Sequence, residues 1–387
     1  MMKTKSLKKK NKLKKVIKNA GIVLACMALI PMIVIFIARG INDVKLRLPD
    51  GVREKGYIEL GGVEQYINIR GANISNPIII YLHGSGGGTN FVLPMQQMVE
   101  SDYTFIYWSR RDGSHTYIKS GETDLLLAND LSDLDELVDY VRARFDQPIV
   151  LIGHSAGTRI GTLYAKAHPD KIAGYIGIGQ LKDDELIDNI RCEISMIAKR
   201  AREAGNEQDA LKIESIYDLW RDFLRDNPII SAEPIKLNPE KEAKLSELEP
   251  VYCRYPPVEP TEKSYTIQAL LSPDLNWNCF RWALADMGIK LGVDVDKYYQ
   301  WVEQMGSNEP FPMLVPPDTL EVPVVIINGS EDFATFAESA QEYYNLLSAP
   351  KKEIFIIQGA GHGPMFEVEY MDEFYDILNK ALKIVLE

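Results

Sequence analysis

Residues 148–157 read PIVLIGHSAG, an apolar run that ends in the pattern Gly-x-Ser-x-Gly. Such a continuous apolar run is typical of a strand buried on both faces, and the helix-forming segment Ala156–Ala167 follows directly. The glycines predict a tight turn, because only small side chains let the strand and helix backbones approach closely. The turn would present the Ser155 hydroxyl at the carboxyl edge of a sheet, beside the N–H groups of a helix N-terminus. Ser155 is therefore the candidate nucleophile, and the alternative is a purely structural glycine-rich turn.

Similar apolar runs recur along the chain and predict further buried strands. They are Pro77–Leu82, Thr104–Trp108, Pro148–Ile152, Ile172–Ile178, Val322–Ile327 and Lys352–Ile357. Apolar residues at three- and four-residue steps, as in Leu126–Val141 and Ala337–Leu347, predict amphipathic helices between them. An antiparallel hairpin is expected from Tyr57–Leu60 and Val63–Ile69 around Gly61-Gly62. The alternation predicts an α/β fold with a mostly parallel sheet covered by helices on both faces.

The alternation stops at residues 181–320, which predicts an insertion into one fold, because a strand pattern resumes at Val322. The first part, Asp184–Asp226, has a helical pattern, whereas residues 227–262 hold seven of the chain's 21 prolines and are expected to be irregular. Four of the five tryptophans lie in this insertion, at Trp220, Trp277, Trp282 and Trp301. We expect them to pack the insertion on the core, and the alternative is an apolar acyl-binding pocket. The predicted core comprises residues 56–180 and 321–387.

A serine nucleophile needs a base, and the chain has only five histidines. His362 follows the last predicted strand through Gly359-Ala360-Gly361, at the sheet edge that carries Ser155. It is the candidate general base. The other four are placed less favourably: His83 in a glycine-rich loop, His115 in a loop, His154 beside the serine, and His168 at a helix end.

An acid that orients the base is expected at the same edge, on a neighbouring strand. Val322–Ile327 runs into Asn328-Gly329-Ser330-Glu331-Asp332, and Asp332 is the candidate. Glu331 is its competitor, and Asp183 or Asp184 are weaker alternatives. A purely structural Asp332 would cap the next helix. The order Ser155, Asp332, His362 is the one found in α/β hydrolases and differs from those of chymotrypsin and subtilisin.

Residues 83–88 read HGSGGG and follow the strand Pro77–Leu82. So many glycines cost conformational entropy, but they suit a loop whose N–H groups face a reacting carbonyl oxygen. A phosphate-binding loop is the alternative, and neither the GxGxxG spacing nor a GK[ST] ending is present.

Ser155, Asp332, His362 and this loop together resemble the α/β-hydrolase superfamily, and within it the branch that includes the proline iminopeptidases. The likeness rests on the loop, on the GHSAG turn and on Tyr107–Gly113 (YWSRRDG), where that branch has a D-x-R-G-like turn. It covers the predicted core, about half of the chain. The resemblance implies an α/β-hydrolase fold in which residues 181–320 form a cap over the active site. It also implies an oxyanion hole formed by the N–H of Ala156 and an N–H at Ser85 or Gly86.

The resemblance implies a serine hydrolase that cleaves an ester, a thioester or an N-terminal peptide bond through an acyl-enzyme. The loop is HGSGGG where the iminopeptidases have HGGPG, and the turn lacks the tryptophan often found after their nucleophile. Aminopeptidase-like and carboxylesterase, lipase or thioesterase-type activity therefore both stay open. Glu193, Glu203 and Glu214 are among many acidic cap residues that could bind a substrate amine. A catalytically silent binding protein of the same fold is the alternative from another class.

The N-terminal region has the features of a membrane anchor. Residues 1–18 hold nine lysines and no acid, and Ala20–Ala38 is a run of 19 uncharged residues. As a helix this run would span about 28 Å, close to the thickness of the hydrocarbon core. We expect a basic cytoplasmic tail (1–18), a single transmembrane helix (19–38), a tether (39–55) and a catalytic domain outside the cytoplasm. A cleaved signal peptide, a lipoprotein site at Cys26 and a buried core helix are the alternatives.

The charge and cysteine content exclude several classes. The net charge of −12, with nine positive charges in the first 18 residues, leaves −21 on the rest of the chain, which argues against a nucleic-acid binder. The four cysteines show no CxxC pair or zinc spacing. We expect no metal or organic cofactor, and free buried thiols rather than a Cys253–Cys279 disulfide. The expected partners are a small-molecule or peptide substrate and the membrane, and the oligomeric state stays open.

Overall fold

The computed structural model describes residues 29–30, 33–38, 40–41, 50–85, 93–182, 186–226, 239–256, 277–286, 289, 291–308 and 318–387. Its centre is an eight-stranded sheet with the order β1-β2-β4-β3-β5-β6-β7-β8. The strands are β1 (Val52–Leu60), β2 (Val63–Gly71), β3 (Ile78–Leu82), β4 (Thr104–Ser109), β5 (Ile149–His154), β6 (Gly174–Ile178), β7 (Val324–Gly329) and β8 (Lys352–Ile357). The strands from β4 to β8 in that order pair in parallel, and β2 is antiparallel to both β1 and β4. The predicted α/β fold with a mostly parallel sheet is therefore confirmed.

The six predicted buried strands are present, with ends that differ by at most two residues. The hairpin β1–β2 turns at Gly61 and Gly62, whose φ angles of 53° and 73° suit residues without a Cβ. The strand β1 begins at Val52, inside the segment predicted as a tether, so the predicted start of the core at residue 56 is wrong by four residues. Pairing with β2 extends this strand, although its outer residues lack a strict apolar alternation.

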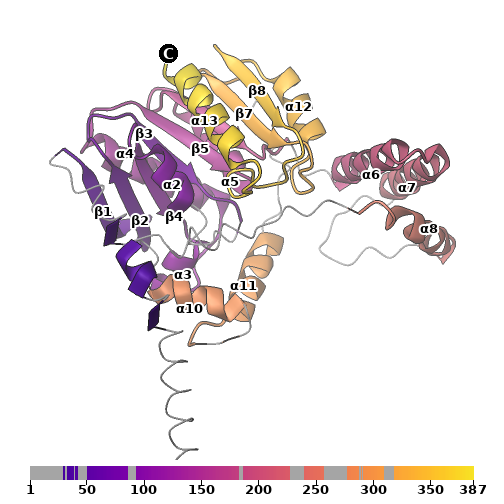
Figure 1. Ribbon diagram of the computed structural model, residues 1–387, viewed down its shortest axis with the longest axis horizontal. Helices are drawn as coiled ribbons and strands as arrows, with labels where there is room; N and C mark the ends of the chain where they lie inside the picture. The colour runs from indigo at the N-terminus through magenta and orange to yellow at the C-terminus, as the bar shows by residue number, and fades with distance from the viewer. Residues whose placement is uncertain are drawn as a thin grey trace, which may run out of the picture.

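Helices cover both faces of the sheet (Figure 1). On one face pack α4 (Leu127–Arg142), α5 (Ala156–Ala167) and α12 (Ala337–Leu346). On the other face pack α2 (Leu93–Val99) and α13 (Met371–Leu386). The short helix α3 (Ser114–Ser120) lies against β2. The inner strands β3 to β7 are nearly fully buried, as expected for their continuous apolar sequences.

The described parts of the insertion are mainly helical and form two separately packed groups. The first group is α6 (Leu186–Glu203), α7 (Glu207–Asp226) and α8 (Pro239–Tyr252), with an apolar cluster of its own that Phe333 of the core also contacts. The second group, α10 (Trp277–Asp286) and α11 (Val295–Asn308), packs on Tyr117 and Ile118 of α3. Figure 1 shows the first group beside α12 and the second below α3. The prediction of an irregular segment is wrong for α8, where Pro239 occupies the first helical residue, a site that tolerates proline.

The tryptophans of the insertion have different environments. Trp282 and Trp301 are buried in the contact with α3, as predicted for residues that pack the insertion on the core. Trp220 is half-buried between the helices of the first group. Trp277 is 62% exposed, so the packing prediction is wrong for this residue.

Two further predictions concern the anchor and the cysteines. Most of the predicted transmembrane segment 19–38 lies outside the described residues. None of the helices in the described part of the chain is long and apolar enough to span a bilayer. Cys192 is a buried free thiol, as predicted. Cys253 is also free, in agreement with the absence of a bridge to Cys279, but it is exposed and not buried.

Candidate active site

Ser155 lies in a strained turn between β5 and α5. Its φ of 53° and ψ of −125° make it the sole non-glycine residue with a positive φ among the described parts of the chain. A Cβ added to Gly157 would lie 2.1 Å from the Leu82 carbonyl oxygen, and one added to Gly153 would lie 2.6 Å from the Gly157 carbonyl oxygen. The small residues are thus required by close backbone contacts, as the sequence pattern predicts. Strain of this kind is concentrated at functional sites.

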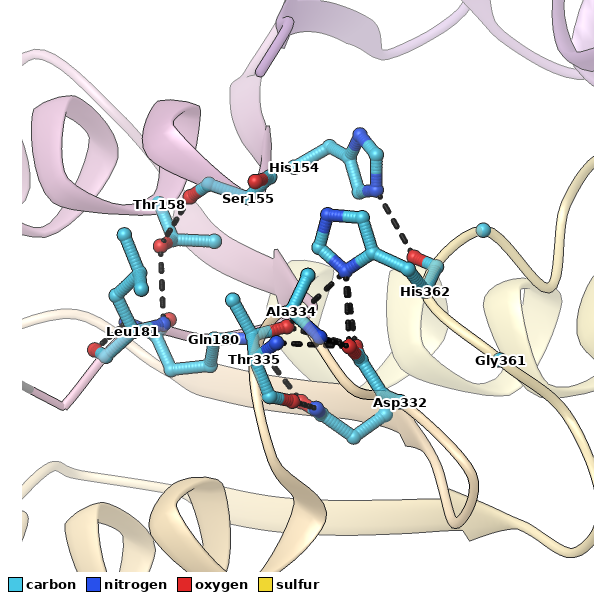
Figure 2. A network of polar contacts seen from close by, with 12 residues as sticks. His154, Ser155, Thr158, Gln180, Leu181, Asp332, Ala334, Thr335, Gly361 and His362 are labelled. Carbon is cyan, nitrogen blue, oxygen red and sulfur yellow. Dashed lines mark hydrogen bonds and ion pairs between the residues drawn. The ribbon is translucent and has the colours of Figure 1, made fainter. Parts of the chain in front are cut away.

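His362 and Asp332 form a direct pair at the same edge of the sheet (Figure 2). The Nδ1 atom of His362 lies 3.1 Å from Oδ1 and 3.0 Å from Oδ2 of Asp332. His362 follows β8, and Asp332 follows β7, the neighbouring parallel strand. Because parallel strands end at one edge, their two following loops meet, although the residues are 30 positions apart.

Asp332 is fully buried and accepts further hydrogen bonds from its own turn. The N–H groups of Ala334 and Thr335 donate to Oδ1 at 2.8 and 2.7 Å, and the Thr335 hydroxyl donates to Oδ2 at 2.7 Å. The helix α12 begins after these residues, with Phe336 as its N-cap, so Asp332 does not cap that helix. These donors fix the orientation of the carboxylate toward the imidazole.

The competing acids are arranged differently. Glu331 forms an ion pair with Arg200 of α6. Asp183 and Asp184 lie outside the described residues. Asp332 is therefore the carboxylate that the structure brings to His362.

Ser155 and His362 are neighbours in Figure 2. The ring of His362 lies against that of His154, which precedes the serine, with the two centroids 4.9 Å apart and the planes tilted by 37°. The hydrogen bonds of the described residues do not include one from Ser155 Oγ to the imidazole. Catalytic hydrogen bonds are often long without substrate and tighten when it binds.

The remaining histidines have structural surroundings. Nε2 of His154 donates to the His362 carbonyl oxygen at 3.0 Å, and burial followed by the neighbouring His362 lowers the pKa of His154 to about 3. Burial, followed by the charge of Arg110, lowers the pKa of His83 to about 4. Both are therefore neutral at pH 7. His115 stacks on Tyr66, and His168 ends α5 beside Asp135.

The loop after β3 lies directly over the serine. A Cβ added to Gly84 would be 3.0 Å from the Ser155 Cβ and 3.5 Å from its Oγ. The Arg110 N–H donates to Nε2 of His83 at 3.1 Å, so the proton of this neutral ring is on Nδ1, which donates to the Gly84 carbonyl oxygen at 2.7 Å. The Arg110 guanidinium also donates to that oxygen, at 3.2 Å. The Gly84 carbonyl oxygen thus points toward the buried side chains of His83 and Arg110, which both donate to it.

The sequence pattern predicted roles for Ser155, Asp332, His362 and Ser85, all of which the structure describes. It also named Gly86, which lies outside the described residues. Three residues that contact this region were not singled out: Thr335 donates to Asp332, Arg110 donates to the Gly84 carbonyl oxygen, and Glu367 accepts from the Gly361 N–H. Arg110 belongs to the YWSRRDG segment, so a sequence pattern that could have pointed to this residue was present. Thr335 and Glu367 belong to no such pattern, because the hydrogen bonds of single loop residues leave no recognisable spacing in the sequence.

A metal role has no support among the described residues, where no group of three or more His, Cys, Asp or Glu side chains could hold an ion. The site instead contains a serine hydroxyl beside a helix N-terminus, a histidine–aspartate pair and a nearby loop. Such an arrangement is suited to nucleophilic attack on a carbonyl group.

The strand order and the strained serine turn are those of an α/β-hydrolase fold, and a comparison with protein families agrees with this. Residues 79–377 match the model described as "Alpha/beta hydrolase family", so the chain belongs to the α/β hydrolase family. The predicted superfamily is thus confirmed.

Individual relatives are distant. The chain is 25% identical over 321 residues to the "Probable aminopeptidase YbaC" of Bacillus subtilis (strain 168), covering 80% of this chain and 91% of the relative. It is 24% identical over 124 residues to the "Proline iminopeptidase" of Saccharolobus solfataricus, covering 32% and 39%. Among solved structures, a proline iminopeptidase-related protein from Thermus thermophilus matches with a TM-score of 0.52 and 18% identity, covering 87% of this chain and 99% of the other. This last likeness concerns the fold alone.

Proposed function

We propose that the chain is a serine hydrolase in which Ser155, His362 and Asp332 form a catalytic triad. Its main support is the hydrogen bond between His362 and the buried Asp332 at the sheet edge where Ser155 occupies its strained turn. His362 takes the proton of the Ser155 hydroxyl as the oxygen attacks a substrate carbonyl, and returns it to the leaving group. Water then hydrolyses the acyl-enzyme with the same histidine as base. No cofactor takes part in this scheme.

The oxyanion hole in this proposal consists of the N–H groups of Ala156, the first residue of α5, and Ser85. In a trans peptide the N–H points away from the carbonyl oxygen. Because His83 and Arg110 bind the Gly84 oxygen, the Ser85 N–H of the same peptide points to the opposite side. The close approach of Gly84 to Ser155 supports its use as a donor to the oxyanion.

The substrate is proposed to be an ester or an amide, including an N-terminal peptide bond. The likeness to a probable aminopeptidase, which extends over most of both chains, supports the peptide alternative. The candidate cap acids do not single out an amine site: Glu193 accepts a hydrogen bond from Tyr252, Glu214 pairs with Arg202, and Glu203 is near Lys199. A panel of p-nitrophenyl esters and aminoacyl β-naphthylamides separates the two classes, and turnover of the amides alone would establish the peptidase.

Labelling with a fluorophosphonate probe tests the nucleophile without a known substrate. The wild-type protein is expected to be labelled, and Ser155→Ala is expected to lose labelling, because the oxygen that attacks phosphorus is removed. Gel fluorescence measures the extent. Ser85→Ala is a matched control, since it removes a nearby hydroxyl and keeps the backbone N–H. Labelling of Ser155→Ala at the wild-type level would refute the nucleophile, and a folded wild-type protein without labelling would favour the silent binding protein.

We further propose that residues 19–38 anchor the protein in the cell membrane, with residues 1–18 cytoplasmic and the catalytic domain outside. The support is the nine lysines before the apolar run. An alkaline phosphatase fused at the C-terminus, which is active only after export, is expected to be active. Deletion of residues 1–38 is expected to abolish that activity. An inactive fusion made at normal levels would contradict the proposed orientation.

A further inference from the structure

The loop between β8 and α13, which carries His362, has its backbone held by two side chains. The Gly361 N–H donates to both carboxylate oxygens of Glu367, at 3.0 Å from Oε1 and 2.9 Å from Oε2. The Gly363 N–H donates to Oε1 at 3.3 Å. From the other side His154 donates to the carbonyl oxygen of His362. The N–H groups of the residues on both sides of the histidine, and its own carbonyl oxygen, are thereby bound.

Glu367 is an unusual residue for this task because it is only 5% exposed. Burying a carboxylate costs free energy unless charges or donors compensate. Burial raises the pKa of Glu367, and the Gly361 and Gly363 N–H groups and the charge of His362 partly offset this increase. Among the described residues, no Lys or Arg forms an ion pair with Glu367. A neutral acceptor could bind two N–H groups at a lower cost, so the hydrogen bonds alone do not account for a carboxylate at this position.

We propose that Glu367 is a positioning residue for His362. Its carboxylate holds the loop through the N–H groups of the neighbouring residues Gly361 and Gly363, and its negative charge stabilises the protonated imidazole. This inference rests on the proposed function, in which His362 receives the proton of Ser155 Oγ. The two carboxylates of Glu367 and Asp332 repel each other, so their burial is compensated most fully when His362 is protonated.

The charged and titratable groups around His362 come from several elements. Asp332, after β7, binds Nδ1, and neutral His154, at the end of β5, lies against the ring. Glu331, beside Asp332, is neutralised by Arg200 of α6. In the part of the chain that the structure describes, Glu367, before α13, supplies a further negative charge that interacts with His362. Replacing Glu367 with a neutral residue therefore removes a negative charge near the imidazole. It does not remove a hydrogen bond made by the ring itself.

The test is the fluorophosphonate labelling rate between pH 4.5 and 9 for the wild-type protein, Glu367→Gln and Glu369→Gln. Glu369 is exposed and only two residues away, so it is the matched control. In Glu367→Gln the maximal rate is expected to fall about tenfold, because the loop loses its bidentate acceptor. The midpoint of the acid limb is expected to move to lower pH by about 0.5 to 1 unit, because a nearby negative charge has been removed. Glu369→Gln is expected to match the wild type in both respects.

A Glu367→Gln protein with the wild-type rate and midpoint would overturn the inference, and so would a slower rate with an unchanged midpoint. If Glu367→Gln does not fold, Glu367→Asp keeps the charge but shortens its reach. Slow labelling of this variant with the wild-type midpoint supports the inference, and labelling at the wild-type rate overturns it. If the wild-type protein is not labelled at any pH, the proposed function fails, which is a distinct outcome.

Discussion

Replacing Asp332 with Asn is expected to slow fluorophosphonate labelling of Ser155 by about 10⁴-fold at pH 7.5. The carboxylate accepts from Nδ1 of His362 and leaves Nε2 free to take the serine proton. An asparagine amide at the same place can donate to Nδ1, which stabilises the tautomer with its proton on Nε2. That tautomer cannot act as the base. The second-order labelling rate constant measures the effect directly.

Glu331→Gln provides the matched control for this prediction. It neutralises the adjacent carboxylate, which pairs with Arg200 and does not bind His362. We expect its labelling rate to stay within about threefold of wild type, since a partly exposed ion pair contributes little. A slow Glu331→Gln beside a fast Asp332→Asn would reverse the assignment of the acid. Thermal unfolding of both variants separates slow chemistry from loss of fold.

The buried neutral histidines His83 and His154 are each expected to lower the stability of the folded protein as the pH falls from 6.5 to 4.5. The pKa of His83 is about 4 in the folded protein and 6.5 in the unfolded chain. Protonation below pH 6.5 therefore favours the unfolded chain, and stability falls as the pH decreases through this window. One such histidine contributes about 2 kcal/mol at pH 4.5. His154, with its pKa lowered to about 3, acts in the same direction.

Urea unfolding at pH 7 and pH 4.5 measures this loss. His83→Asn has no titrating group in this range and keeps an N–H near the Gly84 oxygen, so its loss on acidification is expected to be smaller by about 2 kcal/mol. His154→Gln should also reduce the loss, and it serves if His83→Asn does not fold. His168→Gln, at a partly exposed helix end, is expected to behave as the wild type does. An equal loss of stability in all four proteins would show that these histidines are not the cause.

Much of the sheet was predictable from the sequence because its strands are buried on both faces. Ile149–His154 and Val324–Gly329 lie in largely uninterrupted apolar runs, and no partner needs to be known to recognise them. The serine turn was predictable for a similar reason, because Gly153 and Gly157 meet the backbone of nearby residues and strand β3. By contrast, β1 was partly missed, because its outer residues are held by pairing with β2 and not by burial.

The insertion was the least predictable region. The helix α8 was expected to be irregular because of its prolines, yet Pro239 begins the helix and Pro250 lies near its end. Its Leu248 and Val251 are buried against α6 and α7. Tertiary packing thus outweighs a weak local preference. The division of the insertion into two groups could not be seen in the sequence, since periodicity marks an apolar face without naming its partner.

Local sequence was sufficient for the strained serine turn, the parallel sheet and the choice of His362 and Asp332, because each depends on short-range pattern and on the rule that parallel strands end at one edge. The contacts that complete the site depend on distant segments. Arg110 reaches the carbonyl of Gly84 across 26 residues, and His154 reaches the carbonyl of His362 across 208. His154 and His362 come together because the chain crosses over between β5 and β8 and both strands end at the same edge of the sheet. These hydrogen bonds to the backbone therefore arise from the fold, which orients side chains that carry no local signal of their role.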